Sequence, residues 1–387
     1  MRAKSLALAL LPLALLAALL AWIVVSGPTE ALREGVPPVE RLAISRAVLA
    51  TDGIRLAVLN DGPDPVTIAQ VQVDDAYWAF TQEPAGELPH LRRVQIHVPY
   101  PWVHGETHVV RLVTSTGLTF DHEIAVAVPT PRPSLRFLGV FALVGLYVGV
   151  LPVAFGLLWY PLAGRIGARA IDFLLAFTLG LLLFLLVDAL EEGTEIARQL
   201  PGTYQGVALL ALGVGAAYFA LESLGAWLRS RPSGLEAAVV SALLVAIGIG
   251  LHNFGEGLAI GAAFALGEAA LGTLLVVGFT LHNTTEGLAI VAPLARTPVS
   301  WRRLLGLGLV GGVPTIAGAW LGGFVYSPVA SVLFLALGAG AIAQVVVQIG
   351  RAAAGERPLA RFLGGAPVAG GLFAGFLLMY CTGMLVQ

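Results

Sequence analysis

The sequence has few of the residues that mark a soluble or disulfide-stabilised protein. Charged residues occupy 12% of the 387 positions, about half the share found in a typical soluble domain. Cys381 is the only cysteine, which excludes an intramolecular disulfide. Lys4 is the only lysine and the formal net charge is -2, so nothing in the charge pattern predicts a nucleic-acid partner.

Apolar runs of membrane-spanning length dominate the chain instead. Hydrophobic residues make up 57% of it and the mean hydropathy is +0.84. Since a helix needs about 20 apolar residues to cross a bilayer, we expect an all-α polytopic membrane bundle of eight spans. They lie at about 137–160, 171–190, 205–228, 236–266, 269–294, 303–325, 328–350 and 366–386.

The first 130 residues have a different character. The apolar run after Arg2 and Lys4 is longer than the core of a typical signal peptide, so we expect residues 1–27 to be an uncleaved signal anchor, with a cleaved signal peptide as the alternative. Short alternating runs such as "VTIAQVQV", broken by Gly and Pro, predict a small all-β sandwich-like domain over 38–130. The Pro-rich stretch "PTPRPS" leads into the membrane domain at 131–387.

The loops between the expected spans differ in charge. Alternate loops carry most of the arginines, whereas the loops between them carry mostly glutamate. These arginines are Arg165, Arg169, Arg229, Arg231, Arg296, Arg302, Arg303, Arg351, Arg357 and Arg361. Because cytoplasmic loops are rich in Lys and Arg, we expect a multi-pass protein of the inner cell membrane with its β-domain and both ends of the eight-span core outside the cytoplasm.

Two of the apolar spans contain the same polar motif. Residues 251–260 read "LHNFGEGLAI" and residues 281–290 read "LHNTTEGLAI". A charged side chain at the centre of a bilayer costs at least about 2.5–3.5 kcal/mol, so each glutamate needs a partner. His252 and Glu256 share one helix face, being four residues apart, and the second copy repeats this spacing on a span that runs in the opposite direction.

The two motifs together offer a set of ligands for a divalent cation. The candidate ligands are His252, Asn253, Glu256, His282, Asn283 and Glu286. Imidazole, carboxylate and amide oxygen suit Zn²⁺, Fe²⁺, Mn²⁺ or Co²⁺, and the charge of the ion would neutralise both glutamates. The alternative is that the same side chains form interhelical hydrogen bonds that only stabilise the bundle.

On these motifs the sequence resembles the ZIP (Zrt/Irt-like) divalent-metal transporters, in particular their GufA-like branch. The resemblance covers about 137–387 and implies an eight-span core with its metal site on the fourth and fifth spans. It also implies inward transport by sliding of a helix group that holds the first, fourth, fifth and sixth spans. Zn²⁺ is the expected substrate, with Fe²⁺, Mn²⁺ or Co²⁺ as alternatives, and no cofactor is expected.

Several positions depart from the family pattern. Gly255 and Thr285 stand where each motif usually has a proline, and Val313 stands where a sixth-span glutamate usually bridges two metal ions. We therefore expect one well-formed metal site. Gln344 and Gln348 occupy the seventh span, where a glutamate is often found, and are candidate accessory ligands.

Acidic residues outside the motifs are candidates for an ion pathway. Asp188, Glu191 and Glu192 lie near the outer end of the second span, where they would concentrate cations at an entrance or simply form a solvated helix end. Of these, Asp188 and Glu192 are candidate accessory ligands. Glu222, near the inner end of the third span, is a candidate for lining an exit, or it is satisfied by neighbouring groups.

The β-domain offers a weaker metal-binding candidate. His104, Glu106 and His108 alternate in "WVHGETHVV", so a strand would place them on one face. They would then capture metal for the membrane domain, or they are ordinary surface residues.

Two other functions compete with transport. A non-transporting sensor or anchor with a degenerate ZIP core is favoured by the absent sixth-span glutamate. An intramembrane hydrolase would use His, Glu and Zn²⁺ to activate water, but the sequence has no H-E-x-x-H motif, so we expect no enzyme. The expected partners are divalent ions and the lipid bilayer; a homodimer and an external partner of the β-domain stay open.

Overall fold

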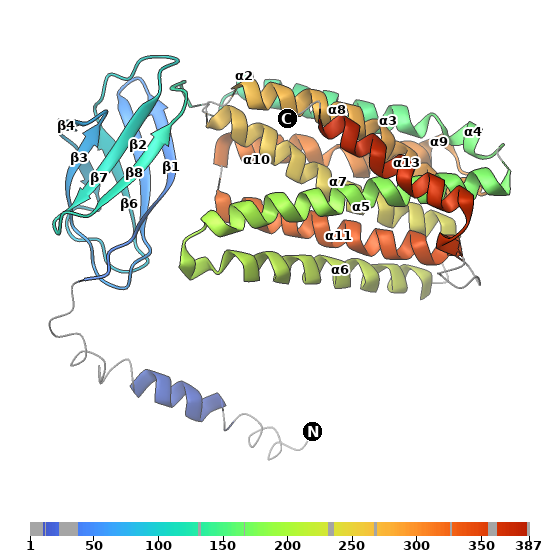
Figure 1. Cartoon of the computed structure of the whole chain (residues 1–387), viewed down its shortest axis with the longest axis horizontal. Helices are drawn as coiled ribbons and strands as arrows, with labels where there is room; N and C mark the ends of the chain where they lie inside the picture. Colours follow the sequence, from blue (N-terminus) through green and yellow to red (C-terminus); the bar gives the residue numbers. More distant parts are fainter. Residues whose placement is uncertain are drawn as a thin grey trace.

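The computed structural model combines a small β-sandwich with a bundle of long helices (Figure 1). It describes residues 11, 13–22, 38–130, 133–165, 167–230, 236–266, 269–325, 327–354 and 362–384. Of the expected anchor over 1–27 it describes only Leu11 and the helix Leu13–Trp22. Arg2, Lys4, Arg231, Arg357 and Arg361 and part of the Pro-rich linker lie outside the described residues.

The sandwich consists of two four-stranded antiparallel sheets, which confirms the predicted β-region. One sheet has the order β1 (Leu42–Ala50), β2 (Gly53–Asn60), β6 (Arg93–Val98) and β5 (Thr81–Glu83). The other has the order β4 (Ala76–Trp78), β3 (Ile68–Val73), β7 (His108–Thr114) and β8 (Thr119–Ile124). Along β7 every second residue is buried, as expected for a strand with one face on a core. Ile54, Ile96 and Leu112 are fully buried between the sheets.

The rest of the described chain is helical. The first span combines α2 (Leu135–Gly145), the π-helix η2 (Leu146–Val150), α3 (Leu151–Leu157) and α4 (Tyr160–Ala163). It is followed by α5 (Ala168–Gln199), the 3₁₀ helix η3 (Gly202–Tyr204), α6 (Gly206–Ser230), α7 (Ala237–Ala265), α8 (Ala269–Val291) and the 3₁₀ helix η4 (Ala292–Leu294). The last spans are α9 (Trp301–Gly312) with α10 (Pro314–Val325), then α11 (Pro328–Ala354) and α13 (Ala366–Gly383).

Within the described residues, eight helical stretches are long and apolar enough to cross a membrane. This confirms the predicted number of spans and indicates a multi-pass membrane protein. The second span is longer than its apolar run of 171–190. Helix α5 continues to Gln199 and ends only where Leu200 becomes extended, directly before Pro201. Its last turns therefore carry polar residues beyond the apolar segment.

The helices pack as two groups. We call α2, η2, α3, α7, α8, α9 and α10 the motif group, and α5, α6, α11 and α13 the frame group. Within the motif group, α7 packs most extensively on α10 and α3 packs on α8, whereas α5 packs on α13 and α11, and α6 packs on α11. A β-carbon added to Gly257 would lie 2.1 Å from the carbonyl oxygen of Thr315, so α7 and α10 approach closely only because this residue is glycine. The main packing between the groups joins α7 to α11.

The sandwich lies at one end of the bundle, where α2 begins (Figure 1). Hydrogen bonds join it to η3, between α5 and α6, and to the end of α10. Since successive spans alternate in direction, the start of α2 and the end of α13 lie on the same side of the bundle as the sandwich.

Candidate metal centre

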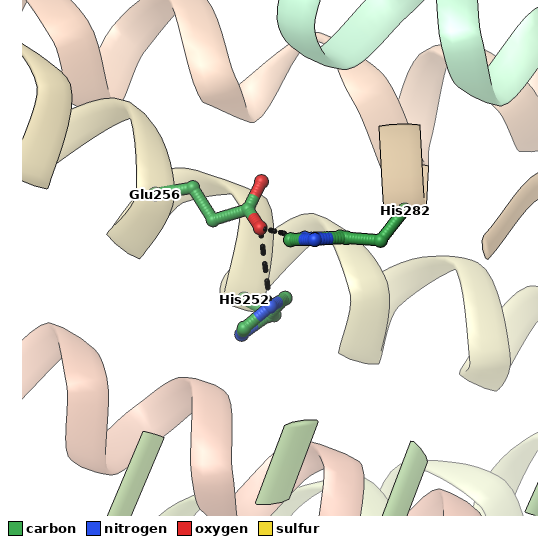
Figure 2. A group of neighbouring side chains, drawn as sticks. All are labelled: His252, Glu256 and His282. Atoms are coloured by element: carbon green, nitrogen blue, oxygen red, sulfur yellow. Dashed lines mark hydrogen bonds and ion pairs between the residues drawn. The ribbon is translucent and has the colours of Figure 1, made fainter. Parts of the chain in front are cut away.

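Helices α7 and α8 bring the two polar motifs together in the bundle. Figure 2 shows His252 and Glu256 of α7 and His282 of α8 pointing toward one another. The Nε2 atom of His282 lies 2.5 Å from Oε1 of Glu256, and that of His252 lies 3.4 Å from the same oxygen. Nε2 of His252 is also 4.0 Å from Oε1 of Glu286. All four side chains are buried, so the motifs form one compact cluster.

The two motif asparagines are held by backbone carbonyl groups of neighbouring spans. Nδ2 of Asn253 donates to the carbonyl oxygen of Gly311 in α9 at 3.0 Å. Nδ2 of Asn283 donates to the carbonyl oxygen of Val148 in η2 at 3.0 Å and to Oε2 of Glu256 at 2.8 Å. Both asparagines are 0% exposed. Because Nδ2 of each asparagine is directed at a backbone carbonyl group, Oδ1 of the same side chain is directed away from it.

Irregular helix geometry makes these carbonyl groups available. In an α-helix the carbonyl of Val148 would accept from residue 152, but Pro152 has no N–H to donate. Val148 also belongs to a π-helix, a rare geometry that occurs frequently at functional sites. Gly311 is the second-last residue of α9, which ends at Gly312, directly before the turn at Val313 that separates α9 from α10. The first span therefore changes helix type, and the sixth span has the junction of α9 and α10, close to the carbonyl groups that the motif asparagines contact.

Several buried polar atoms of the cluster have no hydrogen-bond partner among the described residues. They are Nε2 of His252, Oδ1 of Asn253, Oδ1 of Asn283 and both carboxylate oxygens of Glu286. Leaving such an atom unpaired costs about 1–3 kcal/mol, and more for a charged group. The four oxygen atoms carry lone pairs that can bind a cation, and so does Nε2 of His252 when it is unprotonated. A divalent cation with mixed nitrogen and oxygen ligands would satisfy them together, which residue–residue hydrogen bonds in this structure do not.

An acidic cavity leads to this cluster. Its volume is about 830 Å³, and its wall includes His282 at one extreme and residues at helix ends, such as Gln199 and Met384, at the other. Helix α5 lines it with Asp188, Glu191, Glu192 and Glu195. These residues follow the spacing of a single helix face. The structure thus places the predicted entrance residues in a cavity wall. It adds Glu195, which is seven residues after Asp188 and therefore lies on the same face of α5.

The glutamines of the seventh span belong to a different polar cluster. Nε2 of Gln344 donates to Oε2 of Glu222 at 3.0 Å and to Oε1 of Gln348 at 3.1 Å. Arg351 lies 3.6 Å from the other oxygen of Glu222. None of the described hydrogen bonds or ion pairs joins Gln344 or Gln348 to the motif residues. The two glutamines therefore connect α6 and α11 within the frame group.

The positions that depart from the ZIP pattern do not interrupt the site helices. Both α7 and α8 run without a break through Gly255 and Thr285, so these motifs need no proline kink. Val313 is 42% exposed, unlike the buried residues of the cluster. From the sixth span, the carbonyl group of Gly311 accepts the hydrogen bond from Asn253.

Of the two candidate histidines in the sandwich, His108 has structural partners. His108 is buried, its Nδ1 lies 2.7 Å from Oδ2 of Asp74, and its Nε2 accepts from the backbone N–H of Val103. Tyr100 donates to the same carboxylate at 2.8 Å, and burial together with this bond raises the pKa of Tyr100 to about 12. Both ring nitrogens of His108 are thus engaged, and the arrangement does not favour metal capture with His104.

Comparison with known proteins adds no support for a function beyond what the site itself provides. The functional reading rests on the geometry of the two motifs and on the resemblance that they carry. No protein-family model and no curated protein matches the sequence.

Proposed function

We propose that this protein transports a divalent metal cation across a membrane through an eight-span core of the ZIP type. The observation that carries the proposal is the convergence of two copies of H-N-x-x-E in a buried cluster whose lone-pair atoms lack partners. Ligand atoms of His252, Glu256 and His282 all lie within 4.8 Å of one another. The resemblance to ZIP transporters supplies the direction, from outside into the cytoplasm, and the arginine-rich loops favour the orientation in the inner membrane.

The charge of the cluster favours a single ion. Glu256 and Glu286 together balance one divalent cation, whereas a second ion would leave about two uncompensated positive charges in a buried site. The sixth span contains no Asp or Glu and therefore adds no third carboxylate. The nitrogen and oxygen ligands suit Zn²⁺ first, with Fe²⁺, Mn²⁺ and Co²⁺ as alternative substrates.

The acidic cavity supports an entry path. Carboxylates that line a cleft with low-dielectric walls raise the local concentration of cations. His282 belongs both to the cavity wall and to the cluster. An ion that reaches Asp188 or Glu192 would therefore reach the cluster through the same cavity.

The division of the helices supports alternating access. All six motif residues lie on α7 and α8, and the carbonyl groups that hold the asparagines lie on η2 and α9. Every part of the site thus belongs to the motif group. The acidic row, which we define as Asp188, Glu191, Glu192 and Glu195, belongs to α5 of the frame group. Sliding of one group along the other would carry the complete site away from the acidic cavity without dismantling it.

Flux measurements test the proposal. Purified protein in liposomes should take up radioactive Zn²⁺, and His252→Ala and Glu286→Ala should reduce uptake to the level of empty liposomes. Thr284→Ala is a matched control, because this threonine donates to the carbonyl of Thr280 in its own helix; its uptake should stay near that of the wild type. Failure of the wild-type protein to move Zn²⁺, Fe²⁺, Mn²⁺ or Co²⁺ would exclude transport.

A non-transporting metal sensor is the second candidate. The observation that favours it is the absence of a sixth-span carboxylate at the cluster, since the span contains no Asp or Glu. Such a protein would bind Zn²⁺ in detergent and show no flux in liposomes. Metal binding lost in His252→Ala, together with no transport by the wild type, would assign this function.

A further inference from the structure

The sandwich contacts the frame group through the carboxylate of Asp61 and the guanidinium of Arg93. Oδ2 of Asp61 accepts from the backbone N–H of Gly202 at 2.8 Å, and Oδ1 accepts from the N–H and the hydroxyl of Thr203 at 3.3 and 2.5 Å. Arg93 of β6 donates to the hydroxyl of Tyr204 at 2.9 Å. All three partners lie in η3, the connection between α5 and α6. This contact therefore bears on the helix that carries the acidic row.

The turn that presents Asp61 is fixed from within the sandwich. Nδ2 of Asn60 donates to the carbonyl oxygens of Asp64 and Leu88, and its Oδ1 accepts from the N–H of Gly62. A β-carbon on Gly62 would lie 2.6 Å from the carbonyl oxygen of Val39, so the turn packs tightly on the preceding chain. Asp61 thus moves with the sandwich and not as an independent loop.

The sandwich is also attached to the motif group. Arg46 of β1 donates to the carbonyl oxygen of Phe324, near the end of α10, at 3.5 Å. Burial at this position lowers the pKa of Arg46. In addition, the chain that leaves the sandwich continues into α2, which belongs to the motif group. One rigid domain therefore has attachments to both helix groups at the same end of the bundle (Figure 1).

We propose that the sandwich is a clamp between the two helix groups, and that its Asp61 contact with η3 must open before the groups can slide. The inference rests on the proposed transport function, and it assigns a regulatory role to a domain outside the metal pathway. Gly202 and Thr203 are exposed, so water can replace their hydrogen bonds to Asp61. The contact is therefore suited to reversible opening, unlike the close glycine-mediated packing of α7 on α10.

A crosslink tests whether the contact must open. Asp61→Cys and Thr203→Cys are combined in a Cys381→Ser background and oxidised in proteoliposomes. The crosslinked protein should lose Zn²⁺ uptake, and reduction should restore it. The matched control pair is Asp52→Cys with Arg55→Cys, two residues that contact each other within the sandwich; its oxidation should leave uptake unchanged.

A distance measurement tests the clamp without reference to transport. Nitroxide labels are placed at Leu135→Cys, which begins α2, and at Val207→Cys, near the start of α6; these side chains are 90% and 53% exposed. The wild-type contact should give a narrow distribution of distances between the labels, and Asp61→Ala should broaden it.

The two readouts separate the proposals. Absence of uptake by the reduced double-cysteine protein and by the wild type would count against transport. The distances between the nitroxide labels would then test on their own whether the sandwich clamps the two helix groups. Uptake by the crosslinked protein at the rate of its reduced form would overturn the clamp. An unchanged distance distribution in Asp61→Ala would overturn it as well.

Discussion

Replacing Asn283 by aspartate should make the stability of the protein depend on metal. The substitution keeps the shape of the side chain but puts a carboxylate oxygen where Nδ2 now donates to Oε2 of Glu256 at 2.8 Å. Two unit charges at that distance repel by about 6 kcal/mol at an effective dielectric constant of about 20. Proton uptake limits the cost, since neutralising an ordinary carboxyl group at pH 7 takes about 4 kcal/mol.

A bound divalent cation would remove most of this penalty, because it supplies the positive charge that the two carboxylates lack. We expect Asn283→Asp to melt several degrees below the wild type in chelator, and to regain most of the difference with Zn²⁺. Asn283→Ala is the matched comparison. It also loses the bonds to Glu256 and to the Val148 carbonyl, but adds no charge, so Zn²⁺ should restore less of its stability.

Thermal unfolding in detergent, followed with and without Zn²⁺, measures these differences. If Asn283→Asp is as stable as the wild type in chelator, Asn283 does not face Glu256 as described. If Asn283→Asp is destabilised but Zn²⁺ stabilises it no more than it stabilises Asn283→Ala, the cluster is not a cation site.

Three further predictions concern the cavity, the helix packing and the sandwich. Glu192→Gln should raise the KM for Zn²⁺ uptake with little change in kcat, and the difference should shrink at high salt, because steering by charge is screened. Gly287→Ala should destabilise the bundle by about 1–3 kcal/mol or more, since its β-carbon would lie 2.1 Å from the Val153 carbonyl oxygen, whereas Gly306→Ala, with nothing within 4 Å, should be neutral in the same unfolding assay. Burial raises the pKa of Asp74, but hydrogen bonds from a backbone N–H, a histidine and a tyrosine outweigh this effect, so the pKa is lowered. The ionised Asp74 therefore stabilises the folded protein above about pH 4, and this contribution is lost as the pH falls below that value. Denaturant unfolding across this pH range should show the acid-dependent loss, and Asp74→Asn should lack it.

The number of spans could be predicted because hydropathy alone identifies apolar runs of bilayer length. Helix ends were less predictable, since α5 continues to Gln199 through residues that are polar. The pairing of the motifs followed from two regularities, the four-residue spacing of His252 and Glu256 and the opposite direction of the next span. Short alternating runs likewise predicted strands, although strand order depends on contacts that are distant in sequence.

The groups that complete the site could not be read from side-chain identities. Carbonyl groups occur at every residue, and only Pro152, four positions after Val148, indicates that one of them lacks its helical donor. The exposure of Val313 depends on the turn between α9 and α10, which the apolar pattern does not reveal. The role of Asp61 was equally hidden, because a turn residue shows its partner only when the domains are placed together.

The hydrogen bond between Asn283 and Val148 also bears on how the protein is made. Its two residues are 135 positions apart, so the first span enters the membrane well before its donor has been synthesised. During that interval the Val148 carbonyl lacks the Asn283 donor, and the first span cannot complete its final packing alone. Biogenesis therefore reaches a late checkpoint at the fifth span, whose arrival both completes the first helix and assembles the polar cluster.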